Sequence, residues 1–365
     1  MKFKIGKKDF LDAIRNINMV VERRNTIAIL GNIKIEVAGN ELQLFATDLD
    51  IEATKTIEVN GLADGVTTVA AQTLSEVIAK LKDGDVELTI KDNDLIVKSG
   101  RSRFKLACLD AKDFPVLNDE KYDVSFNIGG GELALLIDNT KFCASTEETR
   151  FYLNGVYLHV IDGKLRGVAT DGNRMAMHDT DAPPASAGLK GVIIPNKALV
   201  VIRKMIEGVA GGVDVCVSDH KIMVKSGKAS ITSKLIDGKF PDYDRVLPKS
   251  NNSTMIANVS ELKSAIDRVS TVSDGQTNCV KLSISEGKIE VSSKSGNGSS
   301  ASEDLIVSNQ FGLEIGFNSK YLLDALAHVK SDECLIKFDQ AVTPTIITGV
   351  EASDYVFVVM PLRVN

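Results

Sequence analysis

The sequence predicts an α+β protein of three tandem, similar domains, each with two helices packed on antiparallel sheets. Short patterns recur between the first and second thirds of the 365-residue chain. Each third also contains two segments in which apolar residues recur every three or four positions, as on the buried face of a helix. Alternating runs separated by turn dipeptides fill the remainder, which is typical of antiparallel strands.

The repeated patterns relate the first two thirds of the chain directly. They keep their order, and their offsets of 123, 126 and 127 residues differ only by short insertions. The last third matches through the order of its elements, which predicts a third copy. The matching pairs are Ala-Thr-Asp at 46–48 and 169–171, Phe-Pro at 114–115 and 240–241, and Val-Lys-Ser-Gly at 97–100 and 224–227.

Six helices are predicted, and the first shows the pattern clearly, because Phe10, Ile14 and Ile17 share one face. Roughly eight strands are expected in each third. Hairpin turns are predicted at Gly39-Asn40, Asp162-Gly163 and Glu286-Gly287. Polar linkers near 117–123 and 248–253 divide the chain into domains 1–121, 122–248 and 249–365. The predicted helices are 7–20, 72–82, 130–142, 195–207, 258–271 and 318–330.

Composition excludes several classes of protein. The sequence contains no run of about 18 apolar residues, so no membrane span is predicted. The first six residues lack the pattern of an export signal. The five cysteines and four histidines are dispersed, so neither a disulfide framework nor a zinc site is predicted. We expect a cytoplasmic protein that uses no cofactor.

No catalytic site is predicted, and the chain is interpreted as a non-enzyme. It lacks the glycine-rich loop followed by Lys-Ser/Thr that binds nucleotide phosphates. Asp48, Asp50 and Glu52 alternate and would suit a divalent cation, but a turn or a solvated strand face is favoured. Asp171 repeats Asp48, so an Asx turn explains both residues more simply than catalysis. An active site assembled between repeats is the alternative.

Charge is distributed unevenly along the chain, whose net charge is −6. The six predicted helices carry thirteen lysines and arginines against nine acids, a net +4, which leaves −10 elsewhere. Helices that shared one surface would attract a phosphate backbone there. Lysine is also simply a good helix former, and on charge alone this second interpretation is favoured. The lack of tryptophan argues against stacking on bases.

Four motifs resemble the bacterial sliding clamps, the beta subunits of DNA polymerase III. They are Ile-Leu-Gly-Asn at 29–32, Ala-Thr-Asp-Gly-Asn-Arg-Met-Ala at 169–176, the run 235–248 around Phe240-Pro241, and 355–363 at the end. The resemblance covers the whole chain. It implies the DNA-clamp fold and a homodimer closed head to tail into a ring around double-stranded DNA. Closure by three copies and a repeat scaffold that binds only proteins are the alternatives.

The resemblance also implies partners and sites. The clamp tethers the DNA polymerase III catalytic subunit, other polymerases and repair proteins through short peptide motifs, and a clamp loader opens it. DNA-facing cations are expected at Arg24, Lys80, Lys197 and Arg203, and the dimer interface at Phe104, Leu106, Thr271 and Val272. The partner-peptide pocket is expected at Leu153, Thr170, Gly172, Asn173, Arg174, Met175, Pro241, Arg245, Val246, Val358, Met360, Pro361, Leu362 and Arg363.

The expected pocket is a mostly apolar cleft with two or three cations at its rim. It suits a short peptide with hydrophobic ends and an acidic or polar middle. The chain departs from the family pattern at Asn173, where histidine is common, and at Asn365, which extends the tail. Both differences are expected to alter peptide affinity.

Overall fold

A computed structural model describes residues 1–22, 26–117, 121–275, 277–351 and 354–363. All six predicted helices are confirmed, and their ends agree within three residues. In the first third they are α1 (Lys7–Ile17) and α2 (Ala71–Lys80), followed by α3 (Gly130–Lys141) and α4 (Asn196–Met205), then α5 (Val259–Ser270) and α6 (Ser319–His328).

The three predicted hairpin turns are also confirmed, because each joins two paired strands. Within the described residues the thirds contain nine, eight and eight strands. The first third gains its extra strand because a short segment after β4 pairs with β1. Its strands are β1 (Lys2–Gly6), β2 (Asn32–Ala38), β3 (Glu41–Thr47), β4 (Ile51–Glu58), β5 (Asn60–Ala63), β6 (Gly65–Ala70), β7 (Asp85–Lys91), β8 (Asp94–Ser99) and β9 (Ser102–Leu109).

The other two thirds repeat this order. The middle third contains β10 (Val124–Gly129), β11 (Gly155–Ile161), β12 (Lys164–Thr170), β13 (Arg174–Asp181), β14 (Val192–Pro195), β15 (Gly212–Val217), β16 (Lys221–Ser226) and β17 (Ala229–Lys234). The last third contains β18 (Ser253–Asn258), β19 (Cys279–Ser285), β20 (Lys288–Lys294), β21 (Ser300–Ile306), β22 (Leu313–Asn318), β23 (Glu333–Phe338), β24 (Thr345–Gly349) and β25 (Tyr355–Val359).

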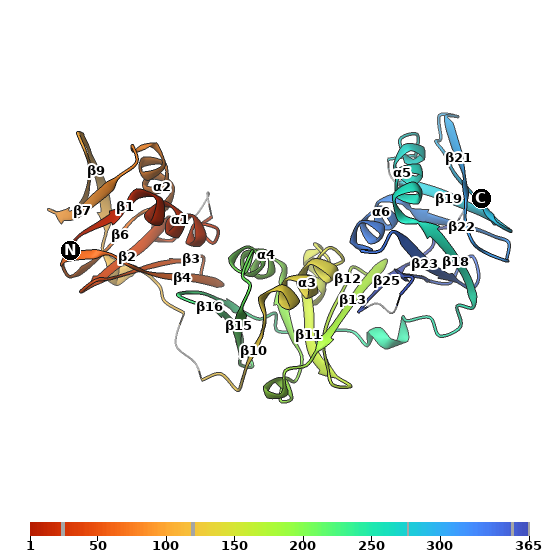
Figure 1. Cartoon of the computed structure of the whole chain (residues 1–365), viewed down its shortest axis with the longest axis horizontal. Helices are drawn as coiled ribbons and strands as arrows, with labels where there is room; N and C mark the ends of the chain where they lie inside the picture. Colours follow the sequence, from red (N-terminus) through yellow and green to blue (C-terminus); the bar gives the residue numbers. More distant parts are fainter. Residues whose placement is uncertain (23–25, 118–120, 276, 352–353, 364–365) are drawn as a thin grey trace. The chain divides into compact units, whose positions relative to one another are not determined.

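The chain forms two compact units, most of whose helices and strands are labelled in Figure 1. Unit 1 comprises Met1–Ala134, Pro183–Leu189 and Lys197–Leu235, and unit 2 comprises the rest. Unit 1 contains one sheet in the order β10-β15-β16-β17-β4-β3-β2-β6-β9-β8-β7-β1-β5. Unit 2 contains the sheets β14-β11-β12-β13-β25-β24-β23-β18 and β21-β20-β19-β22. Every strand pair is antiparallel, as the alternating sequence predicts.

Paired helices cover the sheets and bury their apolar faces. In unit 1, Phe10, Ile14 and Ile17 of α1 are buried, and α1 packs against α2 and strands β3 and β4. In unit 2, α5 packs in the same way against α6, β20 and β21. Among the described residues, no helix is long and apolar enough to cross a membrane.

Strands from neighbouring thirds join edge to edge inside each unit. In unit 1, β17 pairs with β4, and Ile231 lies opposite Ala53. In unit 2, β25 pairs with β13, and Phe357 lies opposite Ala176. These two junctions are copies of one arrangement, in which a large apolar residue faces an alanine across antiparallel strands.

The repeated Ala-Thr-Asp pattern ends a strand and closes a turn in both copies. The Asp48 side chain accepts hydrogen bonds from the backbone N–H groups of Asp50 and Ile51, at 2.9 and 2.7 Å. Asp171 accepts from Asn173 and Arg174 in the same way. The turn interpretation of these aspartates is therefore confirmed.

The alternating acids Asp50 and Glu52 face different partners. Asp50 forms an ion pair with Lys234 at 3.0 Å, and Glu52 accepts a hydrogen bond from the Leu117 backbone N–H. Among the described residues, no group of three histidine, cysteine, aspartate or glutamate side chains is placed to hold a metal ion.

Candidate functional site

The candidate site surrounds the loop between β12 and β13, in unit 2. Thr170 donates through its hydroxyl to the Arg174 carbonyl at 2.7 Å and accepts from the Gly172 backbone N–H at 3.1 Å. Gly172 has φ +92°, a conformation that a residue with a Cβ adopts only under strain. These bonds hold the loop in one conformation with Asn173 exposed at its tip.

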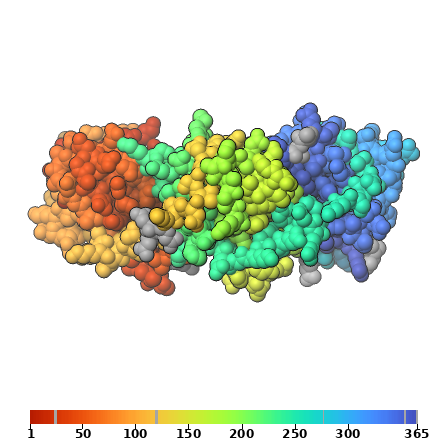
Figure 2. Space-filling view, turned by 90° about the horizontal axis from the view of Figure 1, so that it is seen from below, coloured from red at the N-terminus to blue at the C-terminus, as the bar shows by residue number. Residues whose placement is uncertain are grey.

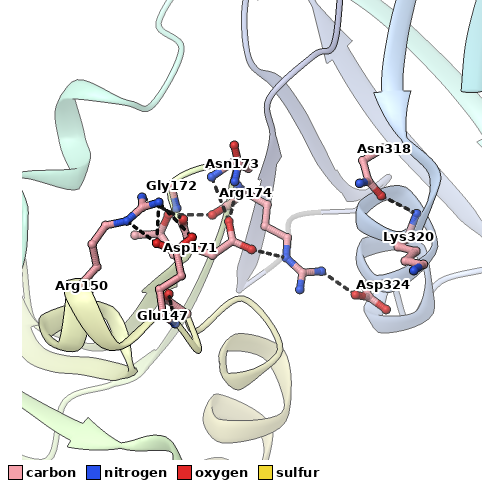
Figure 3. Close-up of polar contacts among 11 residues, drawn as sticks. Glu147, Arg150, Asp171, Gly172, Asn173, Arg174, Asn318, Lys320 and Asp324 are labelled. Atoms are coloured by element: carbon pink, nitrogen blue, oxygen red, sulfur yellow. Dashed lines mark hydrogen bonds and ion pairs between the residues drawn. The ribbon is translucent and has the colours of Figure 1, made fainter. Parts of the chain in front are cut away.

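Arg174 lies between the β12–β13 loop and helix α6 (Figure 3). Its guanidinium contacts Asp171 at 3.0 Å and Asp324 of α6 at 2.5 Å, and it lies over the ring of Tyr321. Only 13% of the Arg174 side chain is exposed. Arg174 is therefore largely enclosed, and two carboxylates offset its charge.

Arg150 is a second cation at the loop, and no sequence pattern indicates it. Its side chain donates to the Asp171 carbonyl at 3.4 Å, forms an ion pair with Glu147, and lies within 2.8 Å of the position that a Cβ on Gly172 would take (Figure 3). The sequence contains no spacing signal for this contact, since Arg150 belongs to a separate 3₁₀ turn, Glu148–Leu153.

The apolar part of the site rests on one buried cluster. Leu153, Met175 and Val358 belong to this cluster, and each is less than 5% exposed. Met360 continues from β25, donates its backbone N–H to the Asn173 carbonyl at 2.9 Å, and is 36% exposed. An exposed apolar residue thus lies beside the loop and next to a buried apolar base.

The segment that follows β17 supplies another part of the site. Phe240 stacks on Tyr157 with ring centroids 4.9 Å apart, and Tyr243 is buried in the same cluster. Pro241, Arg245 and Val246 alternate with these anchors and stay exposed. Figure 2 shows this segment, coloured green to teal, on the surface of unit 2. Arg245 forms an ion pair with Asp242 but keeps 84% of its side chain exposed.

The end of the chain turns toward a different part of unit 2. Leu362 donates its backbone N–H to the Gly316 carbonyl of β22 at 2.8 Å. Arg363 lines a hollow of about 560 Å³ together with Cys279, Lys281 and Glu314. Half-buried Pro361 connects the two regions. The structure thus brings Met360 to the loop, while Leu362 and Arg363 contact the strands of the last third.

Three family models match the chain: the N-terminal, central and C-terminal domains of the DNA polymerase III beta subunit, at residues 1–118, 127–242 and 244–363. The chain belongs to the DNA polymerase III beta subunit family. It is 39% identical over 376 residues to the beta sliding clamp of Caulobacter vibrioides and 34% identical over 366 residues to that of Pseudomonas aeruginosa. Both alignments cover all of each chain.

Solved structures of this family have the same fold. The DnaN sliding clamp of Bartonella birtlesii, bound to griselimycin, has a TM-score of 0.97 and 39% identity, with both chains fully covered. The Pseudomonas aeruginosa clamp bound to griselimycin has a TM-score of 0.97 and 33% identity over the same coverage. The α+β fold with three tandem clamp domains is thereby confirmed.

The cations expected to face DNA differ in their surroundings. Lys80 is exposed at the end of α2, and Arg203 is half-buried on α4. Lys197 forms ion pairs with Glu22, at 2.5 Å, and with Asp48, so two carboxylates offset its charge. Arg24 lies outside the described residues, as does Asn365.

The residues expected at the dimer interface lie on strand β9 and at the end of helix α5. Phe104 and Leu106 are half-buried on β9, which pairs with β8 along its length but with β6 only at Cys108 and Leu109. Thr271 caps the end of α5 and is exposed, and Val272 follows it. In unit 2, β21 is the last strand of its sheet.

Proposed function

We propose that this chain is the processivity clamp of DNA replication in the cytoplasm. Two copies join head to tail into a ring, the ring encircles duplex DNA, and a clamp loader opens it. The clamp tethers the DNA polymerase III catalytic subunit and other polymerases and repair proteins. The three domains are assigned to 1–121, 122–248 and 249–365. The ring is inferred from the junction between antiparallel strands that occurs twice in the chain, at β17–β4 and at β25–β13.

Each internal junction pairs the last strands of two three-stranded antiparallel runs. One of the two strands, β4 or β13, follows the turn that contains Asp48 or Asp171. The other strand, β17 or β25, ends the run β15-β16-β17 or β23-β24-β25. The same positions are filled by β21 in the last third and by β9 in the first. A second copy of the chain would therefore supply β9 to β21, which removes two open edges.

Side-chain size supports this pairing. The hairpin register makes Phe104 the equivalent of Ile231 and Phe357. These three residues lie opposite Val97, Val224 and Ile347, which occupy equivalent positions in their respective strands. Ala301 is likewise the equivalent of Ala53 and Ala176. A head-to-tail dimer with the internal register would place Phe104 opposite Ala301 of the second copy, so the same large–small pair would occur a third time.

DNA contact in this proposal is electrostatic and independent of sequence. Lys80 and Arg203, with Arg24, are the cations assigned to the DNA-facing surface. Lys197 is assigned there too, but its two ion pairs predict a smaller contribution than that of Lys80. A topological ring needs only weak attraction of this kind, because escape requires opening of the ring rather than loss of contacts.

Retention on circular DNA tests the ring. After loading by a clamp loader at moderate salt, the protein is expected to stay on a circular plasmid and to leave the same plasmid once it is linearised. Equal loss from both forms would contradict topological linkage and favour a scaffold held by protein contacts. The fraction of protein that co-elutes with each DNA on gel filtration is the measurement.

The partner-peptide site is assigned to the loop, the buried cluster and the exposed residues around them. It comprises Leu153, Thr170, Gly172, Asn173, Arg174, Met175, Pro241, Arg245, Val246, Val358, Met360, Pro361, Leu362 and Arg363. The clamps solved with griselimycin show that relatives of this fold bind a compound, and we propose that griselimycin binds here.

Val246→Glu is expected to weaken binding of griselimycin about tenfold, since it places a charge on a half-exposed apolar wall. Isothermal titration calorimetry gives the dissociation constant. Val342→Glu is the control, because Val342 is 68% exposed and is not assigned to the site. Equal affinities for both variants would remove Val246 from the site.

A further inference from the structure

A buried polar chain lies beneath the surface segment that carries Pro241, Arg245 and Val246. The Tyr243 hydroxyl is 3.0 Å from His159 Nε2 and 3.3 Å from Arg166 Nη1. Arg166 in turn holds Asp179 through two bonds of 2.6 Å. His159 and Tyr243 are each 8% exposed, so the contact between them is buried.

Chemistry fixes the direction of the first of these hydrogen bonds. A guanidinium has only N–H donors, so Arg166 donates to the Tyr243 oxygen. In the tautomer that carries its proton on Nδ1, His159 accepts the Tyr243 hydroxyl proton at Nε2. An imidazole nitrogen accepts only when it carries no proton, so this arrangement requires neutral His159.

The surroundings of His159 favour that neutral form. Burial lowers the pKa of His159, and the positive charge of Arg166 lowers it further. Asp179 and Asp244 act in the opposite direction but do not outweigh these effects on the pKa. Burial also raises the pKa of Tyr243, which therefore keeps its donor proton. Tyr157, another titratable neighbour, stacks on His159 with ring centroids 4.7 Å apart.

We infer that His159 and Tyr243 are positioning residues that hold the outer wall of the partner-peptide site and make its affinity depend on pH. This inference rests on the proposed peptide site. Tyr243 anchors the segment between Pro241 and Arg245. Loss of its hydrogen bond to His159 would therefore loosen the residues on both sides of Tyr243. Protonated His159 would present a second N–H donor to the same oxygen, beside the Arg166 charge.

Docking of the segment that carries Tyr243 is expected to weaken at low pH. In a loosened segment His159 takes up a proton near its ordinary pKa of about 6.5, whereas the docked segment resists protonation to lower pH. Docking is therefore fully stable above about pH 6.5 and weakens as pH falls from there through the lowered pKa. Loss of one buried hydrogen bond corresponds to about a fivefold change in affinity.

Calorimetric titration of griselimycin at pH 7.5 and pH 5.5 tests the inference. We expect the dissociation constant of the unmodified protein to rise about fivefold at pH 5.5. His159→Gln, whose amide does not titrate, is expected to give the same value at both pH values. Tyr243→Phe keeps the ring but lacks the hydroxyl, so its affinity should be lower at pH 7.5 and independent of pH.

His220→Gln is the matched control, since His220 lies at the β15–β16 turn of unit 1, and it should keep the fivefold change. An unaltered pH dependence in His159→Gln would overturn the inference. So would a Tyr243→Phe variant with full affinity and an unaltered pH dependence. Failure of the unmodified protein to bind at pH 7.5 would instead refute the proposed peptide site itself.

Discussion

Replacing Phe104 with aspartate is expected to convert the proposed head-to-tail dimer into a monomer of 39.3 kDa. In the proposed interface Phe104 faces Ala301 of the second copy, as Phe357 faces Ala176 inside unit 2. A carboxylate there would be buried without a partner, at a cost of several kcal/mol, so the dimer should weaken by about 100-fold or more. Sedimentation equilibrium from nanomolar to micromolar concentration measures the change.

Ile306→Asp is the control for this experiment. Ile306 lies on β21, the strand that carries Ala301, and is 89% exposed. It lies beyond the positions equivalent to those that pair in the two internal junctions. It should therefore remain a dimer. If the two variants dissociated alike, or if Phe104→Asp stayed dimeric, the register derived from the repeats would be wrong. A monomeric Phe104→Asp should also fail to remain on circular DNA.

Arg174→Leu is expected to lower the free energy of unfolding of unit 2 by about 2 kcal/mol. The change leaves Asp171 without its ion pair and removes the contact between the β12–β13 loop and α6. Breaking a buried pair costs about 3–5 kcal/mol, and we expect less here because the Asp324 side chain is 48% exposed and partly screened by water. Thermal unfolding should show a midpoint roughly 4–8 °C lower.

Arg245→Leu provides the matched comparison. Arg245 also forms an ion pair, with Asp242 at 2.9 Å, but its side chain is 84% exposed. Exposed pairs contribute at most about 1 kcal/mol, so the unfolding midpoint should barely change. Equal losses in both variants would mean that the enclosure of Arg174 does not determine its contribution.

Much of the fold was predictable because the decisive signals are local. The apolar spacing of Phe10, Ile14 and Ile17 fixes a helix face wherever that helix packs. A turn such as Asp162-Gly163 requires positive φ at both positions, which the structure has, and so specifies a hairpin without reference to distant residues. The repeated Asp48 and Asp171 turns were predictable for the same reason.

The candidate site was predictable only in part. Family resemblance pointed to Leu153, Met175 and Val358, which the structure brings into one buried cluster. It did not indicate that Arg174 is enclosed by Asp324, or that Arg150 lies over Gly172. No sequence pattern encodes these contacts, since the partners are separated by 150 and about 20 residues and meet only in the folded chain.

The sequence by itself therefore determined the repeat, the helices, the hairpins and the family, since periodicity and turn chemistry act over a few residues. Tertiary structure alone decided which cations lie beside acids that offset their charge. Lys197 is offset by Glu22 and Asp48, whereas Lys80 stays exposed on α2. It also decided that, within the described residues, β21 and most of β9 keep one unpaired edge, because strand pairing depends on which segments meet in space rather than on their own sequences.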